Sequence, residues 1–301
     1  MREHYPRIRI RDGRVLTREG LSLEFYFQPQ TGSGLEVIRA LDTYLNAVEP
    51  QVLTLFTDME GDWQKLTDAE WTRVRQELAN GWGLNTSLAG TPRPEQKYRF
   101  EYEGKRPDLP MVQASPEATS GLSFWLPTEY LEEHGPGRVR ELAIAIASHV
   151  PLLCSGYVGL CFQGPLHLAG VLRPVVERCF RYPGMDIPQM SHLSWEMGAR
   201  VRGPAWLTFL GQPLLGQLGG VARLRSELRA EGTTVQTLAD DRALITLGSW
   251  PEAGDTERGD TLPTYRELAR LLEPWLFFRQ NGSRSEFSAE DRRRWERRFL
   301  D

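Results

Sequence analysis

Residues 142–172 contain no Asp, Glu, Lys or Arg, and this stretch constrains the fold more than any other part of the chain. Its length would suit a membrane-spanning helix. However, Pro151, Gly159 and Pro165 interrupt it, and a spanning helix has to satisfy every backbone polar group internally. We therefore predict a helix that ends near position 148, a buried strand over residues 156–162 and a second helix from about Pro165. Together these segments should form part of the core.

Composition places the chain among soluble globular proteins. Of its 301 residues, 40% are hydrophobic and 25% are charged. The formal net charge of −4 does not favour direct binding to nucleic acid, because nucleic-acid binders usually carry a basic footprint. Cys154, Cys161 and Cys179 are odd in number and lie among apolar residues, so we expect buried thiols in a reducing compartment. The arginine-rich N-terminus has no apolar h-region behind it, which predicts a cytoplasmic protein.

Short apolar runs with turn signals predict an α+β fold, in which a mixed, largely antiparallel sheet or sheets are flanked by helices. Asp12-Gly13 between two β-like runs is the strongest hairpin signal, and the alternation over residues 21–27 predicts a half-buried strand. Other strands are predicted at 98–102, 122–126, 205–210, 235–238, 243–247 and 275–279. Helices are predicted at 35–48, 67–81, 138–148, 166–180 (kinked at Pro174), 213–229, 265–272 and 289–299. We expect one domain over residues 1–301, with a subdivision left open near the Pro- and Gly-rich segment 88–116.

The sequence offers no recognisable catalytic machinery. It contains no Gly-x-Ser-x-Gly elbow and no P-loop, and its five histidines show no pair at metal-ligand spacing. The glycines at 211, 216, 219 and 220 match a dinucleotide-binding fingerprint only loosely, because their spacing is wrong. We therefore predict no catalytic residue, no metal site and no cofactor, and a chain whose work is to bind a partner.

Two acidic loops are the candidate contact surfaces. They contain Asp58, Glu60 and Asp62 in the first loop, and Asp255, Glu257 and Asp260 in the second. Either trio has the oxygen ligands that a divalent cation prefers, but neither matches the spacing of an EF-hand. A solvated loop and a negatively charged contact surface both stay open for each trio. Trp63 and Trp250 are the neighbouring aromatic residues that could anchor such a contact.

An ordered set of motifs extends from position 182 to the C-terminus. The set consists of Tyr182-Pro183-Gly184-Met185-Asp186, Trp206-Leu207-Thr208-Phe209-Leu210, Leu218-Gly219-Gly220, Gly254-Asp255, Pro263-x-Tyr265-Arg266 and Arg294-Trp295-x-Arg297-Arg298-Phe299. In this order and spacing the chain resembles a bacterial family of type VI secretion immunity proteins that are paired with VRR-type nuclease effectors. The resemblance implies a cytoplasmic antitoxin that binds its cognate toxin effector, a nuclease, and blocks the active or DNA-binding surface. It implies neither catalysis nor a cofactor.

The acidic loops suit such a role, because a nuclease presents a basic cleft toward which an acidic surface is steered. We hypothesise that one of the two loops, with Trp63 or Trp250, makes the contact. Two other classes of function stay open from the sequence. One is a metal-dependent enzyme acting on a small molecule, and the other is a structural subunit of a secretion-related assembly. The sequence does not indicate the oligomeric state.

Overall fold

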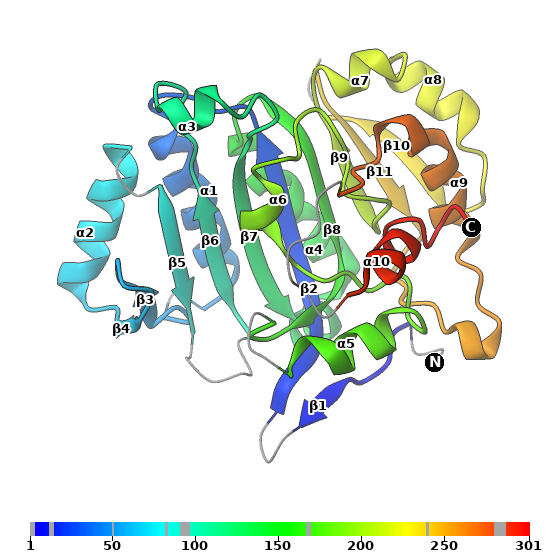
Figure 1. Ribbon diagram of the computed structural model, residues 1–301, viewed down its shortest axis with the longest axis horizontal. Coiled ribbons are helices and arrows are strands. Elements are labelled where there is room, and N and C mark those ends of the chain that lie inside the picture. Colours follow the sequence, from blue (N-terminus) through cyan, green and yellow to red (C-terminus); the bar gives the residue numbers. More distant parts are fainter. Residues whose placement is uncertain are drawn as a thin grey trace.

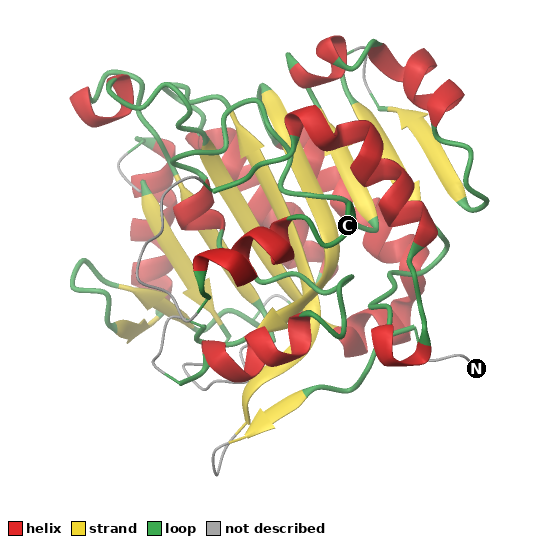
Figure 2. Ribbon diagram, turned by 45° about the vertical axis from the view of Figure 1, so that its right-hand side comes forward, coloured by secondary structure: helices red, strands yellow, loops and turns green. Residues whose placement is uncertain are grey.

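An antiparallel sheet is the central feature of the molecule, seen in a computed structural model that describes residues 4–11, 15–49, 51–81, 84–90, 97–166, 170–238, 241–279 and 287–301. Within these residues the sheet has 11 strands, and helices lie on both of its faces (Figures 1 and 2). The predicted α+β class with a largely antiparallel sheet is confirmed. Among the described residues, no helix combines the length and apolar character needed to cross a membrane.

The strand order is β10-β11-β9-β8-β2-β7-β6-β5-β3-β4, with β1 paired to one part of β2. The strands are β1 (Arg9–Arg11), β2 (Val15–Phe27), β3 (Leu55–Thr57), β4 (Trp63–Lys65), β5 (Asn85–Ala89), β6 (Arg99–Glu103), β7 (Ser120–Pro127), β8 (Leu153–Gln163), β9 (Leu207–Leu210), β10 (Thr233–Thr237) and β11 (Ala243–Leu247). The β1–β2 pairing confirms the predicted N-terminal hairpin, whose Asp12-Gly13 turn lies outside the described residues. Strands on both sides of segment 88–116 belong to this one sheet.

The uncharged stretch contains β8, which lies in the middle of the sheet between β9 and β2. Every residue of β8 is buried, which confirms the predicted strand and extends it at both ends. The prediction of a half-buried strand at residues 21–27 is wrong, because β2 is buried throughout this range. Its polar alternate positions, including Ser22 and Glu24, face a second layer of protein instead of water.

The apolar face of the sheet is covered by α1 (Gly34–Ala47), α2 (Asp68–Ala79) and α4 (Thr128–His149). Leu23 and Phe25 of β2 share one core cluster with Leu41 and Tyr44 of α1. Helix α2 begins as predicted, since the Thr67 side chain accepts a hydrogen bond from the backbone N–H of the residue three positions on. Helices α1 and α4 supply most of the buried helical side chains on this face, whereas α2 contributes Val74 and Leu78.

The opposite face of the sheet holds a buried polar network beneath α5 (Leu172–Cys179), α6 (Met190–Leu193) and α10 (Ala289–Glu296). The hydroxyl of Tyr26 donates to a carboxyl oxygen of Glu24 at 2.9 Å. Nearby, Asp186 pairs with Arg202 at 3.4 Å and with Arg298 at 3.6 Å. Burial lowers the pKa of Arg298 to about 10, and the charge of Asp186 opposes that change. Each buried charge of this trio therefore has an opposite charge beside it, as burial requires.

Three predicted elements differ from the structure. The helix expected at 166–180 begins only at Leu172, and Pro174 falls in its first turn, where a missing N–H costs no helical hydrogen bond and causes no kink. The helix expected at 213–229 is split into α7 (Leu214–Gln217) and α8 (Gly220–Glu227) by Gly219, whose φ is +83°. Residues 275–279 form no strand, only an isolated bridge after the 3₁₀ turn η2 (Glu273–Trp275). The remaining helical elements are α3 (Pro110–Gln113), α9 (Pro263–Leu272) and the 3₁₀ turn η1 (Thr256–Arg258).

Candidate functional site

The first acidic loop is the turn of the β3–β4 hairpin at the edge of the sheet. Asp58 Oδ1 accepts hydrogen bonds from the backbone N–H groups of Glu60, at 3.2 Å, and Asp62, at 2.8 Å. Its other oxygen accepts from Gln64 Nε2 at 2.7 Å, and these hydrogen bonds, that from Gln64 first, hold the pKa of Asp58 below its usual value. Asp58 therefore shapes the turn, while Glu60 and Asp62 are exposed and Met59 at the tip is 99% exposed.

Trp63 follows this turn, but its side chain does not extend into solvent as those of Glu60 and Asp62 do. The side chain is half-buried, and the Arg99 guanidinium lies 5.8 Å from the centre of its ring. Arg99 also lies 5.0 Å from the ring centre of Trp125 on β7. Trp63 is thus held against the sheet by a cation–π contact and offers only part of its surface to a partner.

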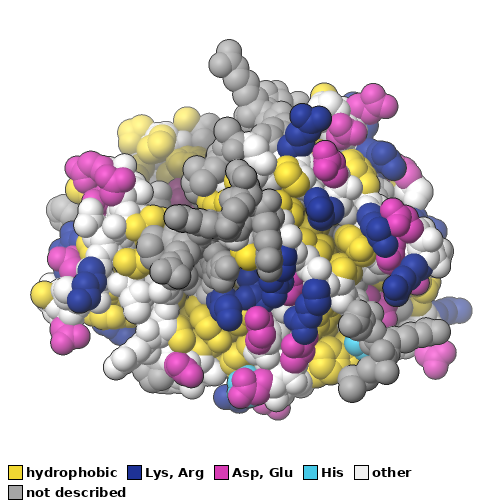
Figure 3. Space-filling view, turned by 90° about the horizontal axis from the view of Figure 1, so that it is seen from below, with side chains coloured by type: hydrophobic (Ala, Val, Ile, Leu, Met, Phe, Trp, Pro, Cys, Tyr) yellow, Lys and Arg dark blue, Asp and Glu magenta, His cyan; other side chains and the backbone are white. Residues whose placement is uncertain are grey.

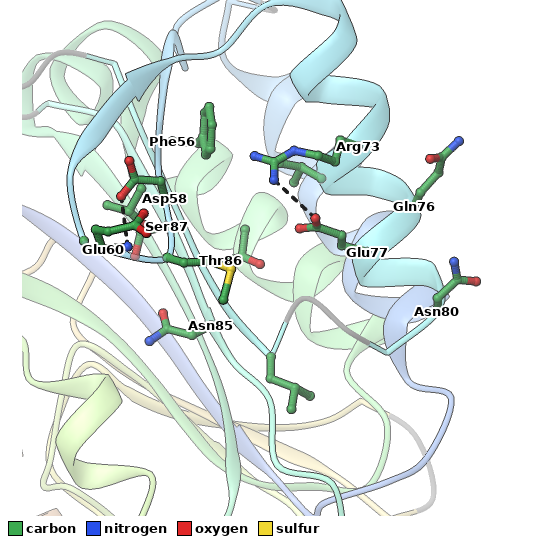
Figure 4. A pocket seen from close by; sticks show the side chains of 15 residues that line it. Phe56, Asp58, Glu60, Arg73, Gln76, Glu77, Asn80, Asn85, Thr86 and Ser87 are labelled. Carbon is green, nitrogen blue, oxygen red and sulfur yellow. Dashed lines mark hydrogen bonds and ion pairs between the residues drawn. The ribbon is translucent and has the colours of Figure 1, made fainter.

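A groove opens between the hairpin turn, β5 and α2, with a volume of ≈ 980 Å³ (Figure 4). Asp58 and Glu60 lie at one end of it, and Asn85 lies along its strand wall. The helical wall presents Glu77 and Asn80. The sequence prediction included the two hairpin carboxylates but missed the groove, because the rest of its lining comes from α2 and β5. The one sequence signal for the groove is the polar run Asn85-Thr86-Ser87 directly before the buried Leu88, because these three residues line its strand wall.

The groove has an acidic lining. Its one arginine, Arg73, forms ion pairs with Glu70 at 2.7 Å and with Glu77 at 3.4 Å. Arg73 therefore pairs with two glutamates of its own helix. It does not neutralise the negative charges of Asp58 and Glu60 at the other side of the groove. An exposed rim of this kind attracts basic groups.

The second acidic loop is organised by an arginine from a distant part of the chain. Arg181 donates two hydrogen bonds to Asp255, at 2.9 and 2.8 Å, and its guanidinium lies 2.6 Å from Glu257. These bonds from Arg181 hold the pKa of Asp255 below its usual value. Asp260 accepts a hydrogen bond from the backbone N–H of Asp255 at 3.0 Å. Ion pairs with Arg181 therefore neutralise part of the negative charge of this loop.

Trp250 stands close to this second loop and is half-buried. Its ring is stacked on that of His4, with ring centres 5.4 Å apart and an interplanar angle of 1°. The ring also packs against the main core cluster. The two predicted loops do not meet, since the β3–β4 hairpin and η1 lie at opposite sides of the molecule (Figure 1).

Neither loop is arranged like a metal site. In the described part of the chain, no group of three or more His, Cys, Asp and Glu side chains could hold a metal ion. The three cysteines are free and buried, and burial raises the pKa of Cys154 to about 11 and that of Cys179 to about 12. These two thiols stay protonated at neutral pH and are therefore poor nucleophiles.

One protein family matches residues 36–299 of this chain: TsiV, described as type VI immunity for VRR-NUC. The chain belongs to this family. The match confirms the predicted resemblance and begins well before residue 182, where the motif set starts, so that it takes in the hairpin and the groove. TsiV proteins are immunity proteins of type VI secretion, and the family's name gives the cognate partner as a VRR-NUC nuclease effector.

The fold is shared with a solved structure. The type VI secretion system (T6SS) protein PA0821 of Pseudomonas aeruginosa superposes with a TM-score of 0.77 at 19% sequence identity. The superposition covers 96% of this chain and 83% of the P. aeruginosa protein. Among curated protein sequences, none matches the chain.

Proposed function

We propose that this TsiV protein neutralises its VRR-NUC effector by covering the active or DNA-binding surface with the acidic hairpin and groove, and that it catalyses no reaction itself. The main support is the contrast between the two acidic loops. Glu60 and Asp62 stand exposed beside the groove, whereas Asp255 and Glu257 are paired with Arg181. The hairpin is therefore the loop whose charge is free to meet a basic partner.

The chemistry of a nuclease fits this surface. An enzyme that cleaves DNA has to attract phosphates, so its DNA-binding surface is basic. Acidic side chains around a groove are steered toward such a surface and speed association. Figure 3 shows both acidic side chains and Lys and Arg on the face seen from below. The net charge of −4 does not favour direct binding of nucleic acid.

The affinity has to be high, because an immunity protein must stay bound for as long as the effector is present. A nanomolar Kd corresponds to about 12 kcal/mol of binding free energy. An interface of about 1,600 Å², with a few hot spots at its centre, supplies that. We propose further that the protein acts in the cytoplasm as one structural unit, which agrees with its three free cysteines and its single sheet.

The test is binding of the cognate VRR-NUC effector to variants of this protein with reversed charges. Glu60→Lys with Asp62→Lys leaves Asp58 in place to hold the turn, so the hairpin keeps its shape. The matched control is Glu227→Lys with Glu231→Lys, two exposed glutamates at the end of the sheet farthest from the hairpin. Both double variants change the net charge equally.

We expect the hairpin variant to bind at least about a hundredfold more weakly, mainly through slower association at low salt, and the control to bind within about twofold of wild type. A third variant, Glu257→Lys with Asp260→Lys, tests the second loop. If only this variant binds the effector more weakly than wild type, the second loop is the contact surface. Wild-type binding by all three variants would show that neither acidic loop forms the interface.

A further inference from the structure

The tip of the β3–β4 hairpin carries the most exposed large apolar side chain in the described part of the chain. Met59 is 99% exposed, whereas the exposed Leu35, Met111 and Leu152 reach only 54%, 59% and 48%. A single exposed apolar residue is common on protein surfaces and by itself indicates nothing. Met59 differs because it stands next to the exposed Glu60 and belongs to the residues that line the acidic groove.

The turn that presents Met59 is held in one conformation. The backbone N–H of Gly61 donates to the carbonyl of Asp58 at 3.1 Å, and the N–H of Asp58 donates to the carbonyl of Asp62 at 3.0 Å. The Asp58 carboxylate accepts two more backbone N–H groups across the same turn. Gly61 has a φ of +88°, which glycine adopts without strain. Asp58 and Gly61 are therefore the residues that this turn requires.

Met59 has no comparable role in the turn. The second position of a β-turn accepts most residues, and proline is the one it favours. At 99% exposure the side chain adds almost no buried area to the fold. The stability of the protein therefore does not depend on an apolar side chain at this position, and the whole side chain is available to a partner.

The hairpin below the turn is attached firmly to the rest of the sheet. Phe56 on β3 and Leu66 directly after β4 are buried, and β3 is paired with β5. Trp63 at the start of β4 lies against the guanidinium of Arg99. A side chain on such a pre-organised support loses little conformational freedom on binding. Methionine is also the apolar residue that adapts best to an irregular partner surface.

The charges around Met59 indicate the chemistry of the surface that it meets. Glu60 and Asp62 are exposed on the same turn, so a basic surface is the one attracted to it. The Lys and Arg side chains of a DNA-binding surface carry long aliphatic stems below their charged ends. Carboxylates can pair with the charged ends while a methionine between them packs against the stems.

We propose that Met59 is the apolar anchor of the interface and inserts into the basic cleft of the effector, against the aliphatic stems of its Lys and Arg side chains. The neighbouring carboxylates set the rate of association, and burial of Met59 slows dissociation. This inference rests on the proposed function, because it names the side chain at the centre of the same acidic contact.

Met59→Ala is the decisive variant, and Met111→Ala is its matched control. Met111 is the other exposed methionine of the described chain and lies on α3, away from the β3–β4 hairpin (Figure 1). We expect Met59→Ala to bind the effector at least about tenfold more weakly, through faster dissociation at low and high salt alike. Met111→Ala should bind within about twofold of wild type. Met59→Leu, which keeps an apolar side chain of similar size, should bind within about threefold of wild type.

Oxidation of the wild-type protein gives a second readout that needs no substitution. Hydrogen peroxide converts exposed methionine to its sulfoxide, and mass spectrometry follows each site separately. In the complex Met59 should oxidise at least about tenfold more slowly than in the free protein, while the rate at Met111 stays unchanged.

The two proposals fail in different ways. If Glu60→Lys with Asp62→Lys weakens binding while Met59→Ala binds like wild type and Met59 oxidises as fast in the complex, the anchor is wrong and the proposed function stands. If neither the charge reversal nor Met59→Ala affects binding, the hairpin is not the interface and the proposed function fails with it.

Discussion

Glu24 offers a direct test of the buried layer on the second face of the sheet. The side chain is fully buried on β2, and the Tyr26 hydroxyl donates to one of its oxygens. Burial raises the pKa of Glu24 to about 8 from an ordinary 4.5, and the nearby charge of Asp186 adds to the rise. Glu24 is therefore mainly protonated in the folded protein at neutral pH, whereas it is ionised in the unfolded chain.

The sign of the pH dependence follows from this difference. Because the folded pKa lies above the unfolded pKa, the contribution of Glu24 to stability is complete below about pH 4.5 and is lost as the pH rises to about 8. The loss amounts to about 1.4 kcal/mol per pH unit. Over the difference of about 3.5 units it reaches about 5 kcal/mol.

Glu24→Gln removes the titration while keeping the shape of the neutral acid. We expect the variant to match wild type near pH 4.5 and to be more stable by about 3 kcal/mol at pH 7. The assay is urea unfolding, followed by tryptophan fluorescence at several pH values, with Glu60→Gln on the exposed hairpin as the control for the substitution itself. If wild type and Glu24→Gln keep a constant difference in unfolding free energy from pH 5 to about 8, the reasoning about Glu24 is refuted.

Three further changes test other parts of the structure. Thr67→Ala should lower the free energy of unfolding by about 1 kcal/mol in urea titrations, because α2 loses its N-cap; an unchanged midpoint would contradict this. Asp186→Asn should cost about 3 kcal/mol or more by the same assay, since Arg202 and Arg298 would lose their buried counter-charge, and a loss below about 1 kcal/mol would show that the ion pairs matter little. Gly211→Ala should lower the melting temperature, because its Cβ would overlap the backbone carbonyl at the start of β8, at a cost of about 1–3 kcal/mol; wild-type melting would show that the turn relaxes freely.

Much of the secondary structure could be predicted from local patterns. The Thr67 cap, the uncharged stretch around β8 and the paired strands β10 and β11 each have a signal within a few residues. The burial of β2 on both faces could not be predicted, because the layer that covers Glu24 comes from residues far along the chain.

The candidate site was predictable only in part. Asp58, Glu60 and Asp62 are close in sequence, so their cluster was visible, and their role as partner contacts stays a prediction. The groove depends on how α2 packs beside β5, which no local pattern reveals. The ion pair between Arg181 and Asp255 joins segments that are far apart in the sequence, so no local pattern predicts it. This ion pair is what distinguishes the second acidic loop from the first.

The most direct test of the account is inhibition of the effector's DNA cleavage by this protein. Purified VRR-NUC effector would be titrated with wild type and with the Glu60→Lys, Asp62→Lys variant. We predict that wild type stops cleavage at a stoichiometric ratio, because the complex is nanomolar or tighter, and that the variant needs at least about a hundredfold more protein. Cleavage that continues under an excess of wild type, or that both proteins stop at the same ratio, would contradict neutralisation through the acidic hairpin and groove.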